Sequence, residues 1–298
     1  SAASENAYYV NGFNTTDPVS GFGGITLPYN TIDQQEVLTG GYSAAFGRSD
    51  GGVLNQVGKR GGNEWHFGAQ QLWTPRSLKG DQQNTYFRYG PDAGKIYRNL
   101  EDSKSWTTTT SAYVSGPLVK DRLFFFAAGE YERTEGNSLG PVNLAYNTKT
   151  RYKDPRFYGK IDWNIADNHS LEATYASSSD SYAGNQYVYD YPTGYTGGYN
   201  SSDTSKKNTG RLGVLKYTGY ITDNLTVTAL YGKLWSTYYT ATPGYDPSLP
   251  YIYQPEQQNP AFGGNISNRQ TTDRIPDAGH KSHNNNLRLD VSYRLGDH

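Results

Sequence analysis

The chain has 298 residues, a formal net charge of −1, 34 Gly, 28 Tyr, and neither Cys nor Met. The absence of Cys excludes a disulfide scaffold, a thiol nucleophile and a Cys-based zinc site. The balanced charge gives no support for nucleic acid as a partner, because affinity for phosphate backbones comes from clustered Lys and Arg. No stretch approaches the roughly 18 apolar residues of a membrane-spanning helix. Aromatic residues make up 14% of the chain, which argues against disorder and indicates a β-protein.

Residues 1–63 come first in chain order and lack a regular alternation of apolar and polar residues. Glycine clusters such as that at 21–24 (GFGG) predict a compact, loop-rich unit. Residues 32–38 are compatible with either a short helix or a strand. The pair Gly61 and Gly62 follows, and we expect it to be a flexible hinge to the rest of the chain. A domain boundary is therefore predicted near residue 63.

From residue 64 onward, short segments alternate between apolar and polar residues with the period of two that is typical of strands. In the clearest segment, 287–295, every odd position is apolar, while Arg288 and Asp290 occupy even positions. About eight strands are predicted, at 64–74, 106–118, 122–132, 157–165, 171–175, 215–221, 225–239 and 287–295. A polar face on almost every strand favours a wet interior over the dry core of a β-sandwich.

The predicted connections between these strands alternate in length. Tight turns are predicted at 117–121, 166–169 and 222–224. Long segments rich in Gly, Asn, Asp, Pro and Tyr lie between them, at about 75–105, 136–152, 180–208 and 240–282. Short turns at one end and long loops at the other are typical of outer-membrane β-barrels.

Four runs of residues are similar to one known family. They are residues 8–12 (YYVNG), 32–48 (IDQQEVLTGGYSAAFGR), 49–66 (SDGGVLNQVGKRGGNEWH) and 115–126 (SGPLVKDRLFFF). They resemble parts of TonB-dependent outer-membrane transporters of the Oar-like group. The first run resembles a plug strand, and the second and third resemble later segments of the plug, the third also containing the first barrel strand. The fourth run resembles the second and third barrel strands. Asn11 replaces the usual Asp of the first run.

The resemblance implies an all-β fold: a transmembrane antiparallel β-barrel with part of a lumenal plug. Residues 1–63 would be the C-terminal part of the plug domain. Residues 64–298 would be the first part of the barrel, with short periplasmic turns and long extracellular loops. Barrels of about 22 strands are wide enough to need a plug. The eight strands are therefore expected to belong to a larger barrel, and the chain to be a fragment without the TonB box and the remaining strands.

The resemblance also implies function. Such a chain would lie in the outer membrane of a Gram-negative bacterium, surrounded by lipid, and would take up an extracellular substrate with energy from the TonB–ExbB–ExbD complex. Residues 14–25 correspond to the plug loop that faces incoming substrate, and Tyr-rich loops suit recognition of peptides or sugars. The candidate ligand-binding residues are Asn14, Asp17, Phe22, Tyr195, Tyr199 and Tyr251. A siderophore, a peptide or protein, and an oligosaccharide all stay open as substrate.

No catalytic residue, cofactor or metal site is predicted. Residues 57–60 (VGKR) lack the Gly and the Ser or Thr of a phosphate-binding loop. His280 and His283 would suit a metal only with a carboxylate, and histidines in solvated loops are far commoner. Two other function classes stay open: an adhesin or display barrel that transports nothing, and a soluble extracellular carbohydrate-binding β-protein.

Overall fold

The computed structural model describes residues 5–40, 46, 51–80, 82–202, 204–249 and 276–295. The described strands form one large antiparallel sheet, a four-stranded sheet in the N-terminal part, and a two-stranded ribbon. Three short 3₁₀ helices accompany them: η2 (Tyr29–Thr31), η4 (Arg76–Leu78) and η5 (Val142–Leu144). Within these residue ranges, no helix has both the length and the apolar character needed to cross a membrane.

The N-terminal unit is a small mixed sheet with the strand order β2-β1-β4-β3. Its strands are β1 (Ala7–Val10), β2 (Phe13–Asn14), β3 (Ile32–Leu38) and β4 (Val53–Gly58). A two-residue turn joins β1 to β2, and its residues Asn11 and Gly12 have φ angles of 50° and 80°. Asn-Gly favours this turn because both residues tolerate positive φ. Residues 32–38, which the sequence left as helix or strand, form a strand.

The large sheet contains the eight strands that the sequence predicts, in the order β15-β14-β13-β11-β10-β9-β8-β5, with β12 paired to β11. Its strands are β5 (His66–Thr74), β8 (Ser105–Val119), β9 (Leu123–Leu139), β10 (Tyr146–Ala166), β11 (His169–Asp190), β12 (Tyr195–Ser202), β13 (Ser205–Thr222), β14 (Leu225–Ala241) and β15 (Asp277–Tyr293). Strands β6 (Thr85–Tyr86) and β7 (Ile96–Arg98) form the separate ribbon. Among the described residues, β5 and β15 are the open edges of the large sheet, so the barrel wall is not closed.

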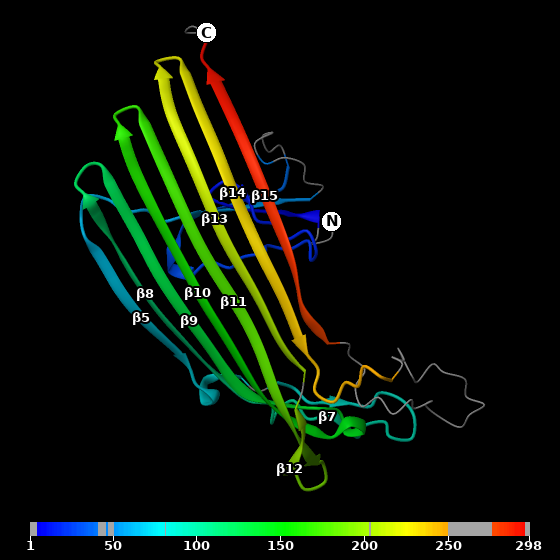
Figure 1. The fold of residues 1–298 in the computed structure, drawn as a ribbon. Helices are drawn as coiled ribbons and strands as arrows, with labels where there is room; N and C mark the ends of the chain where they lie inside the picture. Colours follow the sequence, from blue (N-terminus) through cyan, green and yellow to red (C-terminus); the bar gives the residue numbers. More distant parts are fainter. Residues whose placement is uncertain are drawn as a thin grey trace.

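The connections alternate as predicted. The turns after β8, β10 and β13 are two or three residues long and lie at one end of the sheet, whereas the long connections, β7 and β12 lie at the other end (Figure 1). We call these the short-turn end and the long-loop end. The turn after β8 includes Asp121, which has a φ of 63°.

The predicted loop boundaries need correction at two places. Residues 136–152 and 180–208 were predicted as long loops, but most of them continue the ladders of β10 with β9 and β11, and of β11 with β12 and β13. These strand ends are rich in Ser, Thr, Asn and Tyr and lack apolar alternation. Backbone pairing needs no apolar side chains, so the strands extend beyond the segment that alternation detects.

The N-terminal unit packs against one face of the large sheet, which we call the inner face. Residues Val10, Phe13, Ile25 and Leu27 of the unit share a buried core with Phe126, Ala128, Tyr158, Ala176, Leu212, Val214, Leu230 and Leu234 of the sheet. Full burial of a side chain such as Phe13 contributes roughly 1.5–3 kcal/mol. Gly232 permits this contact, because a Cβ there would lie 2.5 Å from the Phe13 ring.

The opposite, outer face carries exposed apolar side chains at the odd-numbered strand positions that the sequence assigned to the lipid side. Examples on neighbouring strands are Phe157, Trp163, Tyr175, Leu215, Tyr231, Trp235, Leu289 and Val291. One face thus meets the N-terminal unit and is partly charged, while the other is apolar and unpaired in the described structure. This is the arrangement of a membrane-barrel wall.

Candidate functional site

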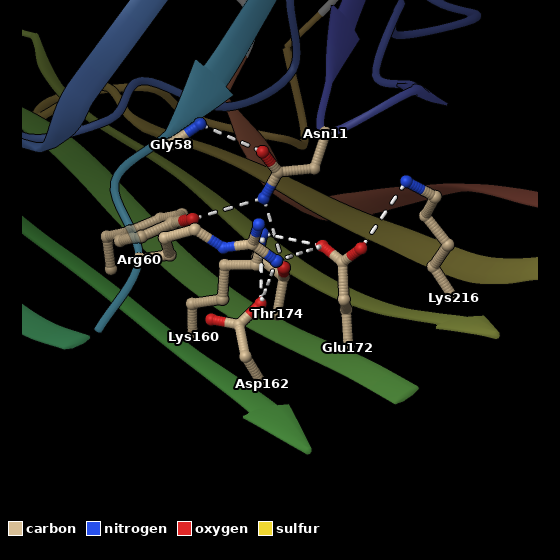
Figure 2. A network of polar contacts seen from close by, with 9 residues as sticks. Asn11, Gly58, Arg60, Lys160, Asp162, Glu172, Thr174 and Lys216 are labelled. Atoms are coloured by element: carbon tan, nitrogen blue, oxygen red, sulfur yellow. Dashed lines mark hydrogen bonds and ion pairs between the residues drawn. The ribbon is translucent and has the colours of Figure 1, made fainter. Parts of the chain in front are cut away.

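Five charged side chains join the N-terminal unit to the inner face (Figure 2), and we call them the inner ion cluster. They are Arg60, Lys160, Asp162, Glu172 and Lys216. Nη2 of Arg60 lies 2.7 Å from Oδ1 of Asp162 and 3.9 Å from Oε2 of Glu172. Nζ of Lys160 lies 2.6 Å from Oε2 of Glu172 and 3.6 Å from Oδ1 of Asp162, and Nζ of Lys216 lies 3.4 Å from Oε1 of Glu172. Three cations therefore surround two carboxylates.

Strand register assembles this cluster. Lys160 and Asp162 are alternate residues of β10 and so share a face, while Glu172 of β11 lies opposite Asp162, and Lys216 of β13 lies opposite Glu172. Lys160 is only 5% exposed, and a buried charge is tolerated when it is paired. Arg60 follows β4, and its hydrogen bond to Asp162, although opposed by burial, raises the pKa of the guanidinium further above its ordinary value.

Asn11 forms a second, uncharged junction beside the inner ion cluster (Figure 2). Its Oδ1 accepts a hydrogen bond from the Gly58 backbone N–H at 2.8 Å. Its Nδ2 donates to Oη of Tyr158 at 3.1 Å and to Oγ1 of Thr174 at 3.0 Å. Asn11, in the turn between β1 and β2, therefore links the end of β4 to strands β10 and β11 of the wall.

A loop formed by residues 15–24, which we call the contact loop, meets the sheet nearer the long-loop end. Asp17 is fully buried there, and its Oδ2 accepts a hydrogen bond from Oγ of Ser282 at 2.7 Å. Its Oδ1 accepts from the backbone N–H groups of Val19 and Ser20, both at 2.9 Å. One carboxylate thus shapes the loop and attaches it to β15. Burial alone would raise the pKa of Asp17, but its hydrogen bonds, with Ser282 the largest, outweigh burial and hold the pKa below its ordinary value.

We expect the attachment of the contact loop to weaken in acid. A carboxyl with a lowered folded-state pKa stabilises the fold fully above its unfolded pKa, and this contribution is lost as pH falls through the folded-state value. Because the pKa of Asp17 is lowered, the hydrogen-exchange protection factors of residues 15–24 should stay high at pH 5 and should fall below about pH 4. The Asp17→Asn variant should lack this acid step, and an equal step in that variant would contradict the assignment.

Two cavities lie beside the contact loop. One of about 240 Å³ is between the loop and the wall, and its polar lining includes Ser20, Asp180, Asn208 and Tyr238. Nδ2 of Asn208 donates to Oδ2 of Asp180 at 2.8 Å. The other, of about 460 Å³, has Tyr8, Phe22, Ile25, Tyr29 and Arg156 in its lining. Both cavities lie further toward the long-loop end than the inner ion cluster does, so a solute entering from that end would meet the contact loop first.

The structure brings some of the predicted ligand-binding residues together and separates others. Asn14 and Asp17 both touch β15, since Nδ2 of Asn284 donates to the Asn14 carbonyl oxygen at 3.0 Å. Phe22 lines the 460 Å³ cavity and is about half exposed. Tyr195 and Tyr199, by contrast, are exposed on β12, at the far tip of the long-loop end (Figure 1). Tyr251 lies outside the described residues.

The sequence reasoning missed the inner ion cluster as a unit. It assigned the polar residues of the strands only in general to a wet interior, and it considered Arg60 only within the rejected phosphate loop at 57–60. Opposite charges at inward positions of neighbouring strands were an available signal, but only the strand register shows that they are neighbours. His280 and His283 face opposite sides of β15: His280 stacks on Tyr238 of the inner face, while His283 lies opposite the outward Trp235.

Gly61 and Gly62, the predicted hinge, differ in their surroundings. Neither has a positive φ. A Cβ at Gly61 would overlap the carbonyl oxygen of Phe125, whereas a Cβ at Gly62 would meet nothing within 4 Å. Gly61 is therefore a point of close backbone approach to the wall, and the hinge role stays a prediction.

This difference gives a matched pair of variants. Gly61→Ala should lower the free energy of unfolding by about 1–3 kcal/mol, because backbone must move to accept the methyl group. Gly62→Ala should change it by less than about 1 kcal/mol. Urea unfolding of the refolded protein measures both changes. Equal losses would show that the approach to Phe125 does not matter.

The chain is similar to known proteins in sequence and in fold. No family model matches it. It is 29% identical over 197 residues to the TonB-dependent transporter Oar of Myxococcus xanthus, a match that covers 57% of this chain and 18% of that protein. It is 26% identical over 158 residues to the probable TonB-dependent siderophore receptor PirA of Acinetobacter baumannii, covering 51% and 18% respectively. Its fold matches that of P. aeruginosa FpvA bound to heterologous pyoverdines, with a TM-score of 0.51 and 10% identity, over 98% of this chain and 43% of that one.

The chain is similar in sequence to TonB-dependent transporters, Oar among them, and it shares the fold of the solved barrel. This Oar-like chain is a protein of the bacterial outer membrane, and its apolar outer face has the composition of a barrel surface that meets lipid. Its matches span 18% of the length of each of the two curated relatives. Those relatives are a transporter and a receptor, which agrees with the absence of any predicted catalytic residue.

Proposed function

We propose that this Oar-like chain is part of a barrel that takes up a substrate across the bacterial outer membrane with energy from the TonB–ExbB–ExbD complex. Residues 1–63 are the C-terminal part of the plug domain, and residues 64–298 are the first part of the barrel. The long loops are extracellular and the short turns periplasmic. Substrate binds the contact loop and the long loops before the plug moves.

One observation carries this proposal: two polar attachments hold the N-terminal unit against the inner face, at different heights. The inner ion cluster lies nearer the short-turn end, and the Asp17–Ser282 contact lies nearer the long-loop end. Hydrogen bonds and ion pairs can be exchanged for bonds to water when the unit moves, although the apolar core that the unit shares with the wall must separate as well. Such attachments suit a plug that must be held firmly at rest and must be displaced during transport.

A disulfide between the contact loop and the wall tests this movement. The chain has no Cys, and the side-chain oxygens of Asp17 and Ser282 are 2.7 Å apart. The Asp17→Cys/Ser282→Cys variant lacks the Asp17 carboxylate in both states, so its oxidised form is compared with its own reduced form. The oxidised form should take up far less substrate than the reduced form. A matched staple, Asp180→Cys/Asn208→Cys, joins two wall strands at opposite positions in the ladder and should leave uptake unchanged.

Uptake is measured in whole cells with three labelled probes in parallel: a ferric siderophore, an oligopeptide and an oligosaccharide. Accumulation of one probe that disappears without TonB supports transport and identifies the substrate class. Surface binding of a probe without TonB-dependent accumulation would favour a display barrel instead. Uptake that persists with the Asp17–Ser282 staple fully formed would exclude displacement of the contact loop.

A further inference from the structure

The outer face carries a group of cations near the long-loop end, which we call the basic rim. Its members are Arg133 of β9, Lys149, Arg151 and Lys153 of β10, and Lys207 of β13. All are odd-numbered positions of unbroken ladders, so their side chains share the face of the apolar band. Four of the five are exposed, and Arg133 is partly exposed. The proposed transport function uses none of them.

The basic rim borders the apolar band on the side of the long-loop end. On β14 the outward side chains run from Val227 to Trp235, a distance of eight residues, or about 20 Å of height at roughly 3.3 Å per residue and a tilt of about 40°. Lys207 lies opposite Tyr239 in the ladder, four residues beyond Trp235, which adds about 10 Å by the same geometry. The cations therefore stand at the height of lipid headgroups, next to acyl chains.

The charges of the basic rim are poorly balanced within the protein. Among the described side chains on the outer face, Glu135 is the carboxylate near these cations. Its Oε1 lies 2.6 Å from Nη2 of Arg133 and 2.6 Å from Nε of Arg151. Lys153 and Lys207 have no ion pair with a described carboxylate. Lys153 also lies directly opposite Arg133 in the ladder. Like charges at such positions destabilise a sheet, and a bound anion would remove that cost.

Two cavities on this face provide space around the cations. A polar cavity of about 560 Å³ has Arg76, Glu135, Lys149, Arg151 and Tyr187 in its lining, together with several Asn side chains. Nζ of Lys149 lies 4.5 Å above the centre of the Tyr187 ring. Cations, amides and an aromatic ring around a cavity of this size suit a phosphorylated sugar.

The second cavity, of about 640 Å³, lies in the apolar band, nearer the short-turn end than the basic rim is. Phe125, Ile161, Tyr175, Leu215 and Trp235 are among its lining residues. Lys233 lies at its margin, with its Nζ 5.0 Å from the centre of the Trp235 ring. Ala127, Gly159 and Gly213 also line it, and these small residues leave a depression in an otherwise bulky surface. An acyl chain would bury apolar surface in such a depression, whereas a soluble anion would gain nothing from an apolar lining.

We propose that the basic rim and the two cavities together bind a phosphorylated glycolipid of the outer-membrane leaflet. The phosphates contact the cations of the rim, the sugar occupies the polar cavity, and an acyl chain lies in the apolar depression. Charge, polarity and height above the band all select this class of ligand. The proposal rests on the proposed orientation, with the long loops outside the cell, and not on what the transporter carries.

Binding is tested with the full-length protein in detergent and a fluorescent lipid A that bears two phosphates, followed by fluorescence anisotropy. Lipid A without phosphates should compete at least tenfold more weakly than the bisphosphorylated form, and added salt should weaken binding. Phosphatidylglycerol and inorganic phosphate should compete poorly. Equal competition by dephosphorylated lipid A, by phosphatidylglycerol or by free phosphate would overturn the assignment to a phosphorylated glycolipid.

Variants locate the site. Lys153→Gln and Lys207→Gln should each weaken binding by about fivefold, the effect of one cation near an anionic leaflet, and Lys153→Arg and Lys207→Arg should retain it. Lys206→Gln is the matched control, because Lys206 is exposed on the inner face next to Lys207. Without lipid, Lys153→Gln should be at least as stable as the parent, since it removes a like-charge pair. An equal loss of binding in Lys206→Gln, or unchanged binding in both outward Gln variants, would overturn the proposal.

Discussion

The Glu172→Gln variant is expected to lower the free energy of unfolding by about 3 kcal/mol, because removal of one partner from a buried ion pair leaves an uncompensated charge. Glu172 contacts Lys160 and Lys216 directly, and Lys160 is 5% exposed. After the substitution, three cations share the single carboxylate of Asp162. Urea unfolding of the protein refolded into lipid vesicles measures the change.

A double variant separates charge balance from packing. Lys160→Met/Glu172→Leu removes one cation and one carboxylate and fills the space with apolar atoms, so it should be more stable than Glu172→Gln alone. Arg60 would still bind Asp162 at 2.7 Å. A double variant less stable than the single one would show that the cluster matters for its hydrogen bonds and not for its charge balance.

The second large effect is expected on the outer face. Leu289→Arg should lower the free energy of barrel folding by roughly 2–4 kcal/mol, because it places a cation near the middle of the lipid-facing band. Val291→Arg lies two residues nearer the short-turn end, and it should lower the free energy of barrel folding by the same amount or less. Leu289 and Val291 are both well exposed on the outer face of β15, and folding into vesicles of defined lipid measures both variants.

The neighbouring inward position is the control. Asp290→Asn should be nearly neutral, since Asp290 pairs with Arg288 at 2.8 Å where both side chains remain partly exposed, and such pairs contribute little. Equal losses in Leu289→Arg and Asp290→Asn would contradict the facing of the whole sheet, because residues one position apart on a strand lie on opposite faces.

Several features of this chain follow from local sequence. The period of two in 287–295 and 157–165 determines which side chains face lipid, because alternation is a property of the single extended strand. The tight turns at 166–169 and 222–224 separate such segments, and Asn11-Gly12 specifies its own hairpin turn. Resemblance in four runs was enough to identify the family. These signals act over a few residues, so they need no knowledge of the partner strands.

The alternation of apolar and polar residues did not predict where the long strands end. Residues 136–139, 146–152 and 180–190 pair through backbone groups, which every non-proline residue has. The ends of β9, β10 and β11 are therefore set by the neighbouring strand and not by side-chain alternation. For the same reason, the polar strand ends near Tyr187 looked like loops.

The sequence by itself determined the all-β class, eight of the nine strands of the large sheet, their facing and the alternation of short and long connections. Only the tertiary structure decided that Arg60 meets Asp162, that Asp17 binds Ser282, and that Lys153 lies beside Arg133. These pairs are 102, 265 and 20 residues apart along the chain. Their contact depends on strand register and on how the N-terminal unit seats against the wall, and both result from packing summed over the whole molecule.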